Sequence, residues 1–119
     1  MTRPLRLSFP GAVYHVTSRG NARHDIVADD RDRSQWLSLL AHVVDRYGWL
    51  CHAYCLMDNH YHLLLRTHDA NLSEAIRWLQ VSYSSVFNWA HRLRGHLFQG
   101  RFRSLLIEDG KGVVEVARY

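Results

Sequence analysis

Two histidines separated by a single residue, His60 and His62, are the residues in this sequence best placed to do chemistry. On a β-strand, residues two apart point to the same face, so both imidazoles would project side by side. Such a pair can hold one divalent metal ion and leave coordination positions open for a phosphate oxygen. Alternatively, both rings lie on a solvated strand face, or one of them is a satisfied core histidine.

The segment 92–103 alternates basic side chains with aromatic residues and glycines. Arginines can bind phosphates, and glycines allow a nucleic-acid strand to approach the backbone closely. Phe98 and Phe102 could stack on unpaired bases, but strand alternation places them on one face, which also fits burial in the core. The predicted DNA-binding residues are Arg92, Arg94, Arg101 and Arg103.

The overall charge favours an anionic partner. The formal net charge is +4, and Lys111 is the one lysine, so arginine supplies almost all of the positive charge. Arginine suits bidentate phosphate contacts, which makes nucleic acid the first candidate partner and a solvated basic surface the alternative. The apolar runs are too short to cross a bilayer, so no membrane partner is expected.

Length and cysteine usage indicate the class of protein. A chain of 119 residues with 47% hydrophobic residues is expected to form a single globular domain over residues 1–119. Cys51 and Cys55 are four residues apart on one predicted strand, where they cannot bridge each other. We expect buried, reduced thiols, which suit a cytoplasmic protein.

Apolar periodicity predicts the elements that must position these residues. Helix 32–47 should end at Gly48, and helix 71–90 should begin at Asn71, with Glu74 completing a capping box. The predicted elements are a strand at 12–18, a helix at 32–47, strands at 49–57 and 60–67, a helix at 71–90, a strand at 101–107 and the start of a helix at 112–119.

This order predicts an α+β fold. Its first six elements follow the ferredoxin-like pattern, an antiparallel sheet with helices packed on one face. The apolar residues 63–65 favour a central position for the strand 60–67, and Tyr61 should point away from the two histidines into apolar packing. The helix at 112–119, which ends at Tyr119, would be an addition to this core.

Four blocks, in order along the chain, resemble the REP-associated tyrosine transposases, which are relatives of the single-tyrosine insertion-sequence transposases. The block 57–64 is similar to their HUH metal motif, named for histidine, hydrophobic residue, histidine. The other blocks resemble the family's opening, a third signature and the start of the helix that carries the nucleophilic tyrosine. They are Phe9–Asn21, Gly95–Ser104 and Glu115–Tyr119.

The resemblance implies a single-stranded DNA endonuclease and strand transferase. Tyr119 would be the nucleophile and would form a 5′-phosphotyrosine intermediate. His60 and His62 would hold Mg²⁺ or Mn²⁺, although ligand softness favours Mn²⁺ or Zn²⁺ over Mg²⁺ for two imidazoles. Single-stranded or hairpin DNA is the implied partner, and a homodimer is compatible with the family.

Family members carry a third metal ligand one helical turn beyond the tyrosine, whereas this chain ends at Tyr119. The resemblance therefore implies a domain truncated at its C-terminus, which folds and binds DNA but cleaves poorly. Two alternatives remain open from the residues alone. One is a non-catalytic domain that binds DNA hairpins, and the other is a small metal-binding structural domain without a nucleic-acid partner.

Overall fold

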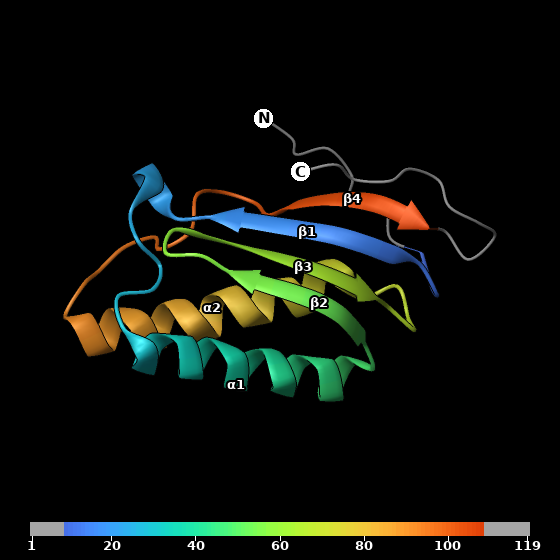
Figure 1. The fold of residues 1–119 in the computed structure, drawn as a ribbon, viewed down its shortest axis with the longest axis horizontal. Coiled ribbons are helices and arrows are strands. Elements are labelled where there is room, and N and C mark those ends of the chain that lie inside the picture. Colours follow the sequence, from blue (N-terminus) through green and yellow to red (C-terminus); the bar gives the residue numbers. More distant parts are fainter. Residues whose placement is uncertain (1–8, 109–119) are drawn as a thin grey trace.

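The computed structural model describes residues 9–108, which form a sheet covered by two helices (Figure 1). Every predicted strand and helix in this range is present, with each boundary within two residues of its expected place. The helix predicted at 112–119 lies outside the described residues. The elements are β1 (Val13–Arg19), η1 (Asn21–Arg23), α1 (Asp30–Tyr47), β2 (Leu50–Leu56), β3 (His60–Arg66), α2 (Leu72–His91) and β4 (Arg103–Glu108).

The strands lie in the order β2-β3-β1-β4, and every neighbouring pair is antiparallel. Since β1 and β2 are both antiparallel to β3, they run parallel to each other with β3 between them. In the same way, β3 and β4 run parallel on either side of β1. Two split β-α-β units of this kind make the ferredoxin-like fold, so the α+β prediction is confirmed and β3 is central as expected.

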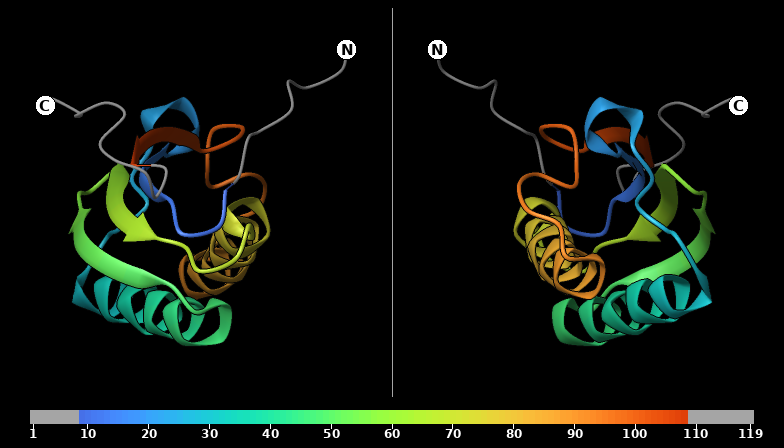
Figure 2. Two further views of the ribbon diagram at one scale, coloured as in Figure 1. Left: turned by 90° about the vertical axis from the view of Figure 1, so that its right-hand side faces the viewer. Right: turned by 90° about the vertical axis from the view of Figure 1, so that its left-hand side faces the viewer.

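Both helices lie on one face of the sheet, and the core fills the space between the two layers (Figure 2). Strand β3 follows the alternation that this arrangement requires, because Tyr61, Leu63 and Leu65 are buried while the residues between them are half-buried. We call the other side of the sheet the outer face. The helices contribute Trp36, Leu40 and Val43 from α1 and Ile76, Leu79 and Tyr83 from α2.

Helix α1 has well-formed ends. Oδ1 of Asp29 accepts a hydrogen bond of 2.9 Å from the backbone N–H of Asp32, so the helix begins at Asp30, two residues before its predicted start. At the other end, Gly48 adopts the left-handed conformation with φ 69°, as the sequence predicted.

The start of α2 differs from the prediction. Asn71 occupies the N-cap position, but its side chain makes no capping hydrogen bond. Its Oδ1 accepts from the indole N–H of Trp49 at 3.1 Å, and its Nδ2 donates to the carbonyl of Tyr47 at 3.1 Å. The predicted capping box is therefore wrong, because the amide joins α2 to the segment between α1 and β2 instead.

The predicted burial of the cysteines is also wrong. Cys55 is exposed, Cys51 is half-buried, and both are free thiols. They lie on the edge strand β2, which has a register shift between Cys51 and Ala53 and carries mostly exposed side chains. Among the described residues, no helix is long and apolar enough to cross a membrane.

Candidate functional site

The two histidines of β3 lie side by side on the outer face of the sheet. The ring centroids of His60 and His62 are 5.0 Å apart, with the rings nearly perpendicular. Both side chains are half-buried, whereas Tyr61 between them is fully buried in the core. Their nitrogens can therefore reach a solvent-accessible ligand from a rigid central strand.

The asparagine before His60 orients its ring. Oδ1 of Asn59 lies 2.8 Å from Nδ1 of His60. When Nδ1 carries the proton and donates it to this amide oxygen, Nε2 becomes the nitrogen that can bind a metal. Histidine ligands in metal sites commonly have such a partner on the second ring nitrogen.

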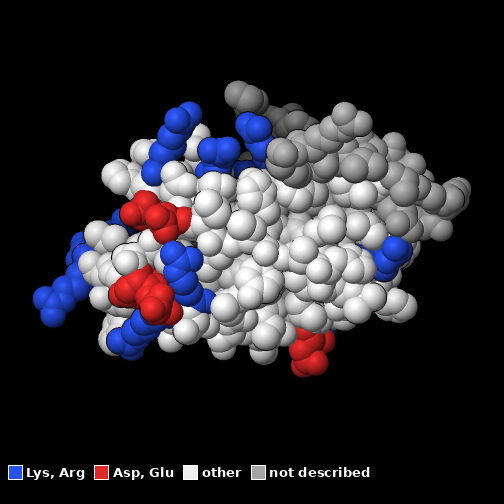
Figure 3. Space-filling model, in the orientation of Figure 1, with Lys and Arg blue, Asp and Glu red and all other residues white. Residues whose placement is uncertain are grey.

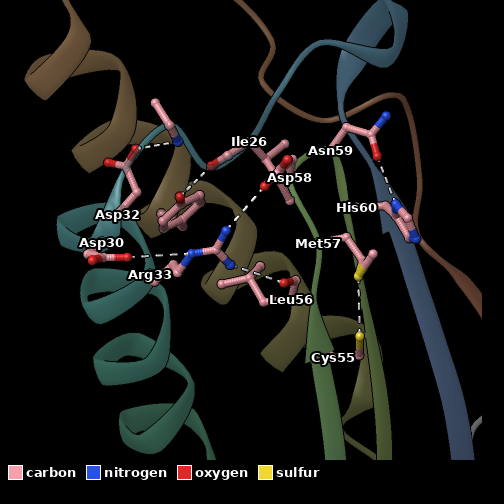
Figure 4. A network of polar contacts seen from close by, with 12 residues as sticks. Ile26, Asp30, Asp32, Arg33, Cys55, Leu56, Met57, Asp58, Asn59 and His60 are labelled. Carbon is pink, nitrogen blue, oxygen red and sulfur yellow. Dashed lines mark hydrogen bonds and ion pairs between the residues drawn. The ribbon is translucent and has the colours of Figure 1, made fainter.

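The turn that carries Asn59 is tied to the rest of the molecule (Figure 4). Arg33 of α1 donates to the carbonyl of Leu56 at 3.3 Å and forms an ion pair of 3.1 Å with Asp58. The backbone N–H groups of Ile26 and Val27 donate to the carbonyl of Asp58 at 2.7 and 3.1 Å. The turn between β2 and β3 is thus held by α1 and by the loop that precedes α1, which limits how far His60 can move.

Two residues of β1 contact His62. Its Nδ1 lies 3.2 Å from Oγ1 of Thr17 and 3.1 Å from Nε2 of His15. The His15 and His62 rings stack with centroids 5.2 Å apart. His15 therefore belongs to this site, although sequence reasoning could not place it. The missing signal was the register, which pairs Thr17 with His62 and leaves His15 two residues away on the same face.

Burial and neighbouring charges lower the pKa values of these imidazoles and so favour their neutral form. Burial lowers the pKa of His60, and the nearby positive charge of Arg19 lowers it further. Burial also lowers the pKa of His62, as do the charges of His60 and Arg19. The pKa of His15 is lowered by burial and by His62. Neutral imidazoles are the form that binds metal, so the site fits a divalent cation in the chemistry of its donors.

The pair would form an open metal site. Within residues 9–108, no third His, Cys, Asp or Glu joins His60 and His62 in a cluster whose ligand atoms all lie within 4.8 Å of one another. A metal held by two imidazoles keeps several positions for other ligands. The tyrosine predicted to act beside it, Tyr119, lies outside the described residues.

A second set of ligand-type side chains escaped the sequence analysis. Ligand atoms of Asp29, Asp32 and His91 all lie within 4.8 Å of one another. Nε2 of His91 lies 3.0 and 2.8 Å from the two oxygens of Asp32, and the closer oxygen also accepts from the N–H of Ala28 at 2.8 Å. These bonds join the start of α1 to the end of α2, so the cluster stabilises the packing of the two helices. From the sequence, only the start of the helix near Asp32 could be predicted. His91 is distant in the chain, so its contact with Asp32 could not.

The predicted DNA-binding arginines do not form one group. Arg101 and Arg103 line a pocket with a volume of about 450 Å³, together with Arg19 and Arg23, which the sequence analysis had missed. Arg92 caps the end of α2 and Arg94 lines a different pocket beside that helix end. The other residues lining the arginine pocket are Thr17, Ser18 and Gln99.

The two phenylalanines of the same segment belong to the core. Phe98 and Phe102 are 7% and 8% exposed. Phe98 packs edge-on against Tyr61, with centroids 5.9 Å apart, and near Tyr83 at 6.3 Å. Stacking on bases is therefore excluded for them in this structure, and they anchor the segment that presents Arg101 and Arg103.

Comparisons with known proteins give a matching family model and solved structures of similar fold. Residues 8–119 match the family model described as "Transposase IS200 like". The fold is similar to a solved REP-associated tyrosine transposase bound to a REP hairpin, with a TM-score of 0.70 and 18% identity over 91% of this chain and 63% of that one. It is also similar to a crystal structure of a candidate transposase from Deinococcus radiodurans R1, with a TM-score of 0.65 and 18% identity over 87% and 85% of the two chains. No curated protein matches.

Proposed function

Since the chain belongs to the family of IS200-like transposases, we propose that it cleaves and rejoins single-stranded DNA with the help of a divalent metal. The observation that carries this proposal is the pair His60 and His62, which lie side by side on the outer face with lowered pKa values, next to a pocket lined by four arginines. The metal and the arginines would bind phosphates of the same DNA strand.

In the proposed reaction, the phenol oxygen of Tyr119 attacks the phosphorus of a phosphodiester. A bond forms between that oxygen and phosphorus, and the bond to the 3′ oxygen of the neighbouring nucleotide breaks. The tyrosine loses its proton to solvent, and the leaving oxygen gains one and becomes a 3′-hydroxyl. The product is a 5′-phosphotyrosine, which a 3′-hydroxyl can attack in the reverse step to rejoin DNA.

His60 and His62 would hold the metal, whose chemistry when bound is to stabilise negative charge on the scissile phosphate. Asn59, Thr17 and His15 would fix the two imidazole rings through the contacts at their Nδ1 atoms. Mg²⁺ or Mn²⁺ is the proposed cofactor, and two imidazoles favour Mn²⁺ of the two.

Single-stranded or hairpin DNA is the proposed partner. The chain spans 63% of the length of the REP-associated tyrosine transposase, so the activity and partners of a whole transposase are proposals here. Arg101 and Arg103 would contact the strand near the histidines, while Arg92 and Arg94 would contact another part of the DNA at the end of α2. A homodimer remains compatible with the proposal.

A covalent trap tests the chemistry. The full-length gene product is incubated with labelled single-stranded DNA and Mn²⁺, and a denaturing gel separates protein–DNA adducts from free DNA. We expect an adduct that Tyr119→Phe abolishes and that His60→Ala or His62→Ala strongly reduces. An adduct that persists in Tyr119→Phe would identify another nucleophile. DNA binding without any adduct would favour a non-catalytic domain that binds DNA hairpins.

A further inference from the structure

The pocket beside the histidines gathers four arginines from parts of the chain that are distant in sequence. Arg19 ends β1, Arg23 lies in η1, Arg103 begins β4, and Arg101 lies two residues before that strand. Thr17, Ser18 and Gln99 complete the lining, so none of the lining residues within 9–108 carries a carboxylate. Figure 3 shows basic side chains along the upper edge of the molecule, where η1 and the neighbouring strands lie.

Backbone contacts hold the two halves of this pocket together. The N–H of Gln99 donates to the carbonyl of Arg19 at 2.8 Å, and Gly20 forms an isolated bridge with Phe98. The N–H of Asn21 donates to the carbonyl of Leu97 at 2.8 Å. Phe98 is buried against the core, which holds the segment 97–99 in place. The hydrogen bonds with this segment then hold η1 in place as well.

The backbone of η1 is unusual where it presents Arg23. Ala22 and Arg23 have φ of 54° and 60°, a left-handed conformation that residues other than glycine rarely adopt. Such strain persists only when surrounding contacts hold it, and it concentrates at binding and catalytic sites. As a result, Arg23 lines the same pocket as Arg19, although the two are only four residues apart in the chain.

The pocket opens directly beside the proposed metal ligands. Thr17 lines it, and the hydroxyl of Thr17 lies 3.2 Å from Nδ1 of His62. In the sheet register, Arg19 pairs with His60 and Thr17 pairs with Arg103. An anion in the pocket would therefore lie next to a metal held by the two histidines.

We infer that Arg19, Arg23, Arg101 and Arg103 form a binding pocket for one backbone phosphate of single-stranded nucleic acid, adjacent to the phosphate at the histidines. The positive charges of these side chains attract an anion to the pocket. Guanidinium groups match phosphate oxygens in bidentate geometry. The inference deepens the proposed function and rests on it, since it assigns the neighbouring phosphate of the same strand.

Equilibrium binding across a series of salt concentrations tests this pocket. The probe is a labelled single-stranded oligonucleotide of mixed sequence, in EDTA so that no metal contributes. Losing the contact with this one phosphate should make the slope of log K against log salt shallower by about 0.7, which is the contribution of one phosphate on a single strand. We expect this change for Arg19→Ala/Arg23→Ala, together with about tenfold weaker binding at moderate salt.

The matched control is Arg31→Ala/Arg46→Ala, which removes the same charge from exposed positions on α1, in the helix layer. It should keep the slope of the parent. Arg19→Lys/Arg23→Lys should also keep it, because the positive charges remain, and circular dichroism confirms that each variant is folded.

Three results would contradict the inference that this pocket binds a phosphate. They are an unchanged slope in Arg19→Ala/Arg23→Ala, an equal loss in the α1 control, and a loss of slope in the lysine variant. Each of these leaves the proposed function standing as long as the parent binds DNA. A parent chain that does not bind the oligonucleotide would contradict the proposed function itself.

Discussion

Oδ1 of Asn59 lies 2.8 Å from Nδ1 of His60, the next residue in the chain. The asparagine is held in its turn, because its carbonyl accepts a hydrogen bond of 2.8 Å from the N–H of Gly20. The contact selects which ring nitrogen of His60 faces outward. The amide therefore orients a ring that we propose as a metal ligand.

Replacing that amide should weaken metal binding without removing a ligand. We expect Asn59→Ala to lower the affinity for Mn²⁺ by about 10-fold to 100-fold, the usual cost of losing a partner on a ligating histidine. Calorimetric titration measures it. Asn59→Asp keeps an oxygen acceptor at the same place and should bind Mn²⁺ at least as well as the parent. An unchanged affinity in Asn59→Ala would show that this contact does not orient the ligand.

The identity of the metal ligands is a separate prediction. His60→Ala and His62→Ala should each abolish Mn²⁺ binding measured by calorimetry or by paramagnetic relaxation of water. His42→Ala is the matched control, since His42 is an exposed histidine of α1 that stacks on Trp78.

The cluster of Asp29, Asp32 and His91 offers a rival metal site among the described residues. We expect His91→Ala to leave the Mn²⁺ affinity unchanged, because His91 is already engaged by both oxygens of Asp32. Loss of binding in His91→Ala, with binding retained in His60→Ala, would move the metal from β3 to the junction of the two helices.

Gly20 is predicted to tolerate no side chain. A Cβ added there would collide with the backbone carbonyl of His24, which cannot move independently of η1. Gly20→Ala should therefore lower the free energy of unfolding by about 1–3 kcal/mol, as overpacking does. Urea denaturation measures the change. A variant as stable as the parent would mean that η1 can open, and with it the attachment of Arg23 to the arginine pocket.

Alkaline pH should destabilise the fold through Tyr61. Burial raises the pKa of Tyr61 to about 12 from an ordinary value of 10. Between these two values the folded state keeps a proton that the unfolded state has lost, so stability falls as pH rises. The contribution is fully present below pH 10, and on the order of 3 kcal/mol is lost by pH 12.

Urea denaturation at several pH values between 9 and 12 checks this dependence, with Tyr61→Phe as the comparison. The variant keeps the buried ring but has no phenol to ionise, so its stability should fall less steeply. Parallel curves for the two proteins would assign the alkaline loss to other groups, such as Tyr83, whose pKa is also raised by burial and by nearby Asp32.

Much of the molecule follows from local pattern. The alternation of His60, Tyr61 and His62 determined that the two imidazoles share a face, because side chains on a strand alternate whatever lies around them. Apolar spacing likewise determined both helices, and Gly48 determined where α1 ends. These features depend on residues close together in the chain, so they could be derived without knowing the fold.

Other features depended on which distant segments meet. Arg92, Arg94, Arg101 and Arg103 are neighbours in sequence, but the turn after α2 separates the first two from the last two. The partners of Arg101 and Arg103 come instead from the end of β1 and from η1, namely Arg19 and Arg23. Strand pairing brings these segments together, and the periodicity of apolar residues along the chain does not indicate which strands will pair.

The same reason explains the remaining differences. Register placed His15 against His62, and helix docking placed His91 against Asp32. Asn71 has the residue type of a helix cap, yet its amide bonds with Trp49 and Tyr47, which only the packed fold brings within reach. The sequence by itself determined the elements and the histidine pair, whereas tertiary structure decided their polar partners, because a hydrogen bond depends on distances that arise only when the elements pack.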